Sequence, residues 1–211
     1  LEYKGTDNDG AEQIDTISVF SSRILFSDSF ENTSITNWIE GNDSDNLAYW
    51  DSDGGELKQY YNVTFGALAE SYHLGTYVYP DQSLLNSRSS FRLSLDITPL
   101  ANDGDGSEGN DVGIMFPFDI SDPQNYFRLS MNSRYGFTRL EKRNGVNFET
   151  LAVNSIGYID DQPINIAIEV IEGSIFVFID GEPVFAESDL DIQPGTVALY
   201  CQDRVSFDNL V

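Results

Sequence analysis

Residues 168–211 read IEVIEGSIFVFIDGEPVFAESDLDIQPGTVALYCQDRVSFDNLV. Apolar residues alternate with other residues on both sides of Glu172-Gly173, which is typical of a half-buried antiparallel hairpin. Asp180-Gly181 predicts a second hairpin, because a tight turn needs the positive φ that this pair supplies. A further strand is expected after Gly195, with Val197, Leu199 and Cys201 on one side, and the chain closes on residues 207–211.

The same alternation continues upstream, with turn signals about every ten residues, as in a β-sandwich. Asn144-Gly145 predicts another hairpin turn. We expect no amphipathic helix beyond a turn or two near residues 84–86 or 187–190. The chain of 211 residues fits one large all-β domain. Inward positions of the middle strands are expected at Phe91, Leu93, Leu95, Ile97, Val112, Ile114, Phe116, Phe118, Phe127, Leu129 and Met131.

Charge narrows the range of partners. The chain carries 35 acidic and 11 basic residues, a formal net charge of −24. A nucleic acid needs a basic footprint, and an anionic membrane surface repels such a chain, so we expect neither as a partner. No apolar run approaches the ~20 residues of a membrane span, so no membrane insertion is expected. Many of the acids lie in Asn/Asp/Gly clusters that suit Ca²⁺, although a solvating acidic surface explains the scattered ones equally well.

The single cysteine excludes an internal disulfide. Cys201 alternates with apolar residues, so we interpret it as a small buried hydrophobe and not as a nucleophile. One histidine and one cysteine do not favour a zinc site. Trp38 is expected in the core.

Several segments together resemble the concanavalin A-like jelly rolls, which are laminin-G-like and lectin-like β-sandwiches. At the C-terminal end the resemblance is carried by IDG, by P-G-x-V-x-L-Y and by F-D-N-L-V. At the N-terminal end it is carried by residues 24–31, Trp38, Trp50 and residues 53–57. The resemblance covers residues 23–211. It implies a two-sheet antiparallel β-sandwich from a secreted carbohydrate-binding, adhesive or glycan-processing protein, and it specifies the fold better than the ligand.

Residues 1–22 differ from the rest of the chain. They are acidic and rich in turn residues, and residues 5–15 resemble the calcium-binding joints between modules of large bacterial surface adhesins. We interpret 1–22 as a linker, or as the edge of a neighbouring module, with a short strand at residues 16–20. A flexible acidic linker without metal is the alternative. The start at Leu1 favours a piece of a longer secreted or surface protein, in which residues 23–211 form a monomeric module.

The resemblance also implies a structural Ca²⁺ where the first and last strands adjoin. Glu31 and Asp208 match the acidic ligands, Asp28 is a possible substitute, and Gly54 in the Gly54-Gly55 turn would supply a carbonyl oxygen. A divalent ion offsets the repulsion between such carboxylates. The alternative is that Asp28 and Asp208 cap turns.

Residues 102–111 form a second candidate calcium loop. Four oxygen-bearing residues fall at relative positions 1, 3, 5 and 9 of an EF-hand-type loop. The match is partial, because Glu108 stands where that loop has Gly and Ile114 stands where it has a bidentate Glu. A solvated loop between two strands is the alternative. The candidate ligands are Asp103, Asp105, Ser107 and Asp111.

Catalytic patterns are weak in this sequence. The retaining glycosidases of the resembled fold share E-x-D-x-x-E, and residues 169–172 have two acids at a suitable spacing but lack the central Asp. The lyases of that fold need a Tyr or His base, for which His73 is the one histidine available. A lone histidine on a strand is more often structural. The sequence therefore favours a binding module over an enzyme and leaves the enzyme open.

We predict a surface that binds glycan, or a peptide, on another cell or matrix. Sugars are held by aromatic rings and by planar hydrogen-bonding groups, and 13% of the residues are aromatic. Partial burial in the core is the alternative for each aromatic residue. The expected function is that of a non-catalytic, calcium-dependent adhesin module, with a glycan-active enzyme or a calcium-stiffened spacer as alternatives. Five ligand-binding residues are expected to share the concave, non-core face of neighbouring strands, namely Arg92, Asp96, Met115, Tyr126 and Arg128. Further candidates in loops are Trp50, Tyr135, Tyr49, Tyr60, Tyr61 and Asn132.

Overall fold

The computed structural model describes residues 2–6, 12–16, 24, 26–31, 35–43, 47–64, 74–81, 89–101 and 110–211. Every regular element in these ranges is a β-strand. None of the described residues belongs to a helix with the length and apolar character needed to cross a membrane.

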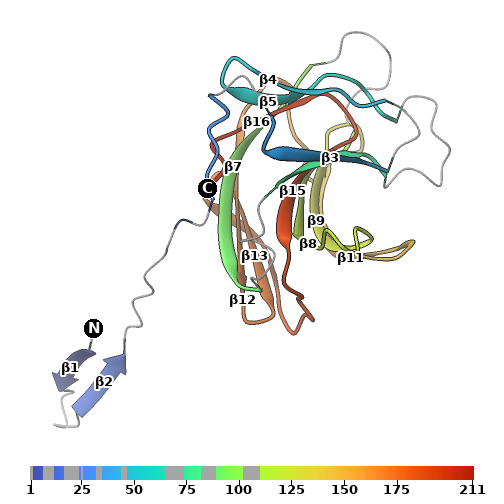
Figure 1. Cartoon of the computed structure of the whole chain (residues 1–211). Helices are drawn as coiled ribbons and strands as arrows, with labels where there is room; N and C mark the ends of the chain where they lie inside the picture. Colours follow the sequence, from blue (N-terminus) through green and yellow to red (C-terminus); the bar gives the residue numbers. More distant parts are fainter. Residues whose placement is uncertain are drawn as a thin grey trace.

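Fourteen of the described strands form two seven-stranded sheets, in which every neighbouring pair is antiparallel (Figure 1). Sheet I has the order β11 (Asn147–Asn154), β10 (Phe137–Asn144), β9 (Asn125–Asn132), β8 (Val112–Phe118), β15 (Thr196–Cys201), β6 (Thr76–Pro80) and β3 (Trp38–Asn42). Sheet II has the order β14 (Glu182–Glu187), β13 (Ser174–Ile179), β12 (Ile164–Ile171), β7 (Phe91–Pro99), β16 (Val205–Asp208), β5 (Glu56–Gln59) and β4 (Trp50–Asp53).

The two hairpins predicted in the C-terminal stretch are confirmed. Glu172 and Gly173 have φ values of 47° and 78°, and Asp180 and Gly181 have 51° and 82°. Positive φ at both central residues is the geometry that matches a two-residue turn to the right-handed twist of its strands. Within the first hairpin Ile168 pairs with Val177, so the apolar residues of β12 and β13 share one face, as the alternation predicts.

The last strand lies inside sheet II and not at its edge. β16 pairs with β7 on one side and with β5 on the other. Just beyond it, Leu210 bridges Asp28 through two backbone hydrogen bonds of 2.9 and 3.0 Å. The segments near the two ends of the domain are therefore adjacent, which is the arrangement that the resemblance implies.

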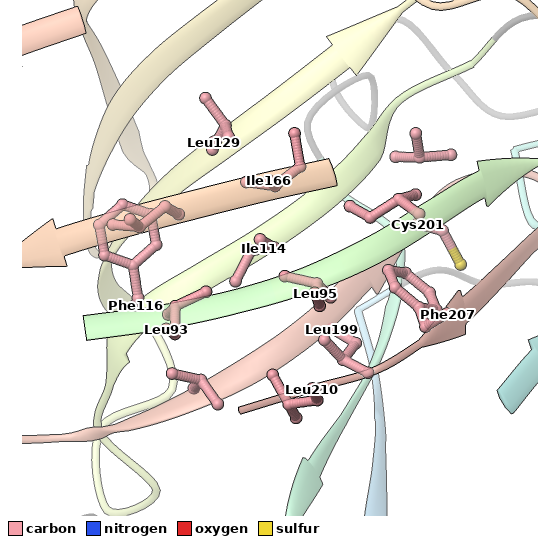
Figure 2. Close-up of a cluster of buried hydrophobic side chains, with 14 of the residues drawn as sticks. Leu93, Leu95, Ile114, Phe116, Leu129, Ile166, Leu199, Cys201, Phe207 and Leu210 are labelled. Atoms are coloured by element: carbon pink, nitrogen blue, oxygen red, sulfur yellow. The ribbon is translucent and has the colours of Figure 1, made fainter. Parts of the chain in front are cut away.

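The core fills the space between the two sheets. Leu93, Leu95 and Phe207 of sheet II face Ile114, Leu129 and Leu199 of sheet I in one continuous apolar cluster (Figure 2). Trp38 and Cys201 belong to this cluster, as predicted, and burial raises the pKa of the Cys201 thiol well above its ordinary value. The thiol is therefore neutral and inert in the folded protein.

Two local features differ from the sequence predictions. Phe118 lies on the outer face of sheet I, because the register between β15 and β8 shifts between Thr196 and Ala198 and turns the end of the strand over. Near the N-terminus, β1 (Glu2–Thr6) pairs with β2 (Glu12–Thr16) in a hairpin that the sequence analysis does not predict. The strand predicted at 16–20 lies almost wholly outside the described residues.

We expect Leu95→Ala to lower the free energy of unfolding by about 2–5 kcal/mol, because the side chain is fully buried between the sheets. Urea denaturation measures the change. Ile171→Ala is the control, since Ile171 is 48% exposed on the same sheet. Equal unfolding midpoints for the two variants would contradict the described core.

Candidate functional site

The outer face of sheet I, which points away from sheet II, carries a network of arginine and carboxylate side chains. Strand register builds this network, because β9 and β10 set Arg128 opposite Glu141 and Ser130 opposite Arg139. Side chains directly opposite each other on one face of an antiparallel pair lie within contact distance. Alternation along β10 gives Arg139, Glu141 and Arg143 the same outward direction.

The ion pairs in this network are linked end to end. Arg128 donates to Glu141 at 2.7 Å, and the second carboxylate oxygen of Glu141 lies 3.2 Å from Nε of Arg139. Arg139 continues to Asp111 at 2.8 Å, and Asp111 also accepts a 2.6 Å hydrogen bond from the Asn132 amide. A guanidinium group presents several donors in a fixed plane, so each carboxylate is held in one orientation.

An aromatic cluster continues the same face on the other side of Arg128. It consists of Tyr77, Met115, Phe118, Tyr126, Ala198 and Tyr200, with Tyr79 packed against it. Glycine makes room for one of the rings: a methyl group at Gly41 on β3 would lie 2.2 Å from the ring of Tyr77. Burial, together with the nearby charge of Asp43, raises the pKa of Tyr77 to about 12. The phenol therefore remains a neutral donor at physiological pH.

Arginine side chains join the aromatic cluster to the ion pairs. The guanidinium of Arg128 lies 4.6 Å from the ring centre of Tyr200 and 5.0 Å from that of Phe148. Arg143 donates to Asp43 at 2.6 Å and to the Tyr126 hydroxyl at 3.2 Å. Contacts of a cation with ring faces are favourable and strengthen when water is excluded.

The buried cation at the centre of the network is stable only because of these partners. Arg128 has no exposed surface. Burial by itself lowers the pKa of its guanidinium, but Tyr200, Tyr126 and Glu141 raise that pKa overall, so the side chain stays charged. Arg143 behaves alike: burial lowers its pKa, and Tyr126 and Asp43 raise it overall. The network is therefore rigid and pre-organised.

The five ligand residues predicted on the β-strands do not share one face. Met115, Tyr126 and Arg128 lie on the outer face of sheet I, but Arg92 and Asp96 belong to β7 in sheet II, on the other side of the sandwich. Arg92 is exposed and forms an ion pair with Glu169 at 3.3 Å. Asp96 accepts hydrogen bonds from the Asn165 and Asn209 amides at 2.8 and 2.9 Å.

The predicted ligand-binding roles of Met115, Arg128 and Trp50 are not consistent with the burial of these side chains. Met115 and Arg128 have no exposed surface, so neither is open to a ligand in this conformation. Trp50 is a core residue and not a loop aromatic: it stacks on Phe207, and its indole donates to Thr76 at 2.9 Å. Tyr135 remains an exposed candidate at 67%, beside the guanidinium of Arg134 in the β9–β10 turn.

The structure brings together part of the predicted first calcium site. A methyl group at Gly55 would lie 3.2 Å from a Glu31 carboxylate oxygen, so Glu31 reaches the Gly54-Gly55 turn. Phe207 pairs with Leu57, and Asp208 therefore continues along β16 towards the same turn. Asp28 has a different role, because its oxygens accept hydrogen bonds from the Phe30 amide and the Trp38 indole at 2.8 and 2.9 Å. This matches the alternative that Asp28 caps a turn.

Most of the second calcium loop cannot be placed. Asp103, Asp105 and Ser107 lie outside the described residues. Asp111 is buried next to β8 and is held by Arg139 and Asn132, so its carboxylate is part of the arginine network. Within the described ranges, no cluster of three or more His, Cys, Asp or Glu side chains has the spacing of a metal site.

The predicted catalytic candidates are separated or lie outside the described residues. His73 is among the latter. Glu169 forms an ion pair with Arg92 on sheet II, and Glu172 occupies the positive-φ position of a turn. Tyr126, which the sequence predicts as a ligand-binding residue, is buried on sheet I beside Arg143.

Several residues of the site are missing from the sequence prediction. Arg139, Glu141 and Arg143 alternate in the sequence, and that period of two is a usable signal for a shared strand face. Tyr77 and Tyr79 alternate in the same way. No sequence signal identifies Asp43 as the hydrogen-bond partner of Arg143, because the two residues are 100 positions apart in the chain.

No protein-family model matches the chain, and no curated protein matches it by sequence. Solved structures do match. The chain is similar to the carbohydrate-binding module CBM66 from Bacillus subtilis, with 15% identity, 83% of this chain and 94% of that chain covered, and a TM-score of 0.64. The chain is also similar to a β-glucanase of Bacillus licheniformis, with 11% identity, 88% of this chain and 95% of that chain covered, and a TM-score of 0.58.

A third similar structure is a Bacillus subtilis protein of unknown function with a galectin-like fold. The two sequences are 11% identical, the match covers 100% of this chain and 96% of that chain, and the TM-score is 0.59. At these identities the likeness establishes the fold. The fold is therefore an all-β, two-sheet jelly-roll sandwich similar to the folds of these structures, as the sequence predicts.

We expect Glu141→Gln to cost about 3–5 kcal/mol of stability, because it leaves the buried Arg128 cation without its carboxylate. Glu169→Gln is the matched control, since it breaks the ion pair with the exposed Arg92 and should cost about 0–1 kcal/mol. Urea unfolding at neutral pH measures both changes. Similar small losses for the two variants would show that Arg128 is solvated.

Proposed function

We propose that this chain is a non-catalytic carbohydrate-binding module whose ligand lies against the outer face of sheet I. The observation that carries the proposal is the continuity of the aromatic cluster with the arginine network on a face that points away from the core. Sugar recognition needs both kinds of group, because a pyranose has an apolar face and a rim of hydroxyls.

The accessible groups lie at the edge of this buried arrangement. Tyr79 is half-buried, and its ring lies 6.4 Å from that of Tyr77 and 5.4 Å from that of Phe118. Asp43 is partly exposed while it accepts from Arg143. Arg139 keeps some exposed surface while it holds Asp111 and Glu141. The buried members thus fix the side chains that would meet a ligand.

The solved structures of the same fold support this class of ligand. One similar structure is a carbohydrate-binding module and another is a β-glucanase. Between binding and hydrolysis, the geometry favours binding. A retaining glycosidase needs two carboxyl groups facing the substrate about 5 Å apart. Glu141 and Asp111 instead direct their oxygens to arginine and asparagine donors.

We further propose that Ca²⁺ binds where the first and last strands of the domain adjoin. Glu31 and Asp208 would provide carboxylate oxygens, and the Gly54-Gly55 turn would provide a carbonyl oxygen. These oxygen donors suit the ion chemically. When bound, Ca²⁺ would supply positive charge between the two carboxylates and hold the strands together. In this proposal the module belongs to a secreted or surface adhesin that recognises glycans on another cell or matrix.

A glycan array probed with and without a chelator tests the proposed function. We expect the unaltered protein to bind a glycan and Tyr79→Ala to bind it about tenfold or more weakly. An aromatic contact contributes about 0.5–1.5 kcal/mol in addition to the burial of its apolar area. Ile159→Ala is the control, because Ile159 is exposed in the β11–β12 connection, where the Asp161 amide donates to Pro99 of sheet II. Failure of the protein to bind any glycan, or equal binding by Tyr79→Ala, would contradict the proposal.

Thermal unfolding tests the calcium proposal separately. At a hundredfold excess over its Kd, Ca²⁺ should stabilise the fold by about 2.7 kcal/mol and raise the Tm by roughly 5–10 °C. The double variant Glu31→Gln/Asp208→Asn should lose this shift, whereas Glu182→Gln, at an exposed position on β14, should keep it. If Ca²⁺ leaves the Tm of the unaltered protein unchanged, the calcium proposal is contradicted.

A further inference from the structure

A second aromatic surface lies at one end of the β4–β5 hairpin in sheet II. It is formed by Tyr49, Tyr60 and Tyr61, which we call the tyrosine platform. The ring of Tyr49 lies 5.5 Å from that of Tyr60 and 6.1 Å from that of Tyr61, each at an interplanar angle of 42°. Tyr49 is 48% exposed and Tyr61 is 55% exposed. About half of the surface of Tyr49 and of Tyr61 is therefore open to solvent, and their rings lie close to one another.

The backbone of the platform is held in place from inside the sandwich. Gln59 has no exposed surface, and its amide donates to the Tyr61 carbonyl at 2.6 Å and accepts from the Tyr61 N–H. The Tyr60 N–H donates to the Tyr49 carbonyl at 3.1 Å. A buried side chain thus clamps the exposed Tyr61, and a cross-strand hydrogen bond fixes its neighbours. This rigidity lowers the entropy cost of placing a ligand on the rings.

Polar groups stand next to the rings on the same face. Trp50 and Gln59 point into the core, so alternation directs Tyr49 and Asp51 outwards together with Lys58. The Tyr49 hydroxyl donates to Asp51 at 3.3 Å. Lys58 lies near Asp53 and Glu56 at 3.4 and 3.1 Å. Asp51 pairs with Lys58 across the two strands, so a ligand on the rings would meet an acceptor and a donor on neighbouring strands.

We propose that the tyrosine platform is a second carbohydrate-contact site, which binds neutral pyranose units. Open ring faces fit the apolar side of a pyranose, and Asp51 and Lys58 fit its hydroxyls. The surrounding acids and the net charge of −24 disfavour polyanionic glycans and acidic peptides. They also disfavour a second copy of this chain, which would bring the same charge.

This inference rests on the proposed function in its class of ligand, which is carbohydrate, but the platform lies on sheet II and uses other residues than the proposed binding face of sheet I. An experiment can therefore disprove binding at one of the two sites without disproving binding at the other.

NMR titration of the protein with neutral oligosaccharides tests the inference. The probes are β-1,4-linked and β-1,3-linked glucohexaose, and hexagalacturonate serves as the anionic comparison. We expect saturable shifts at Tyr49, Tyr60 and Tyr61 with a neutral probe and none with hexagalacturonate. The double variant Tyr49→Ala/Tyr61→Ala should weaken this binding about tenfold or more.

Two control variants separate stacking from other effects. Tyr49→Phe keeps the ring and should retain binding, and Ile171→Ala, with the same 48% exposure on the same sheet, should leave it unchanged. Tyr79→Ala should leave the platform shifts intact. Absence of shifts at the platform with both neutral probes, or equal affinity of the double variant, overturns the inference. Concentration-dependent dimerisation that disappears in the double variant would also overturn it, because a second copy would then be the occupant.

Discussion

The last strand, β16, is inserted into the middle of sheet II and joins the two parts of that sheet. β16 supplies hydrogen bonds to both β7 and β5, so the β4–β5 hairpin is attached to the sheet only through the C-terminal segment among the described pairings. Phe207 of this strand stacks on Trp50 in the core, and Leu210 bridges Asp28. Long-range pairings of this kind cost loop entropy, which the apolar core between the sheets must offset.

The inner faces of both sheets are filled with aliphatic and aromatic side chains, so polar and charged side chains are placed on the outer faces. The two outer faces differ in how these side chains are arranged. On sheet I, cross-strand register sets each arginine of β9 and β10 opposite a carboxylate or a hydroxyl group, and the result is a buried, pre-organised network beside an aromatic cluster. On sheet II, the corresponding face holds exposed single pairs such as Arg92 with Glu169. Burying Arg128 is costly in free energy, and such a cost is often tolerated at functional sites.

The alternation at residues 164–179 was sufficient to predict the β12–β13 hairpin and its register, because adjacent strands joined by a tight turn leave little choice. The same reasoning misplaced Arg92 and Asp96 relative to Arg128, since alternation predicts which side of a strand a residue occupies but not which sheet the strand joins. The prediction that Phe118 faces inwards is wrong, because a register shift is invisible in an otherwise regular pattern. The prediction that Trp50 lies in a loop is also wrong, because Trp50 is the first residue of β4 and is buried in the core.

Hydrogen exchange of the last backbone amides tests whether the C-terminal segment is part of the cooperative fold. The Leu210 and Val211 amides donate to Asp28 and Ser94 at 3.0 and 2.9 Å, so they should exchange only when the whole domain unfolds. We expect protection comparable to that of Leu95 in the centre of β7, although terminal residues normally fray. Exchange of Leu210 and Val211 at the rate of the Gly181 turn amide, with Leu95 still protected, would contradict this expectation.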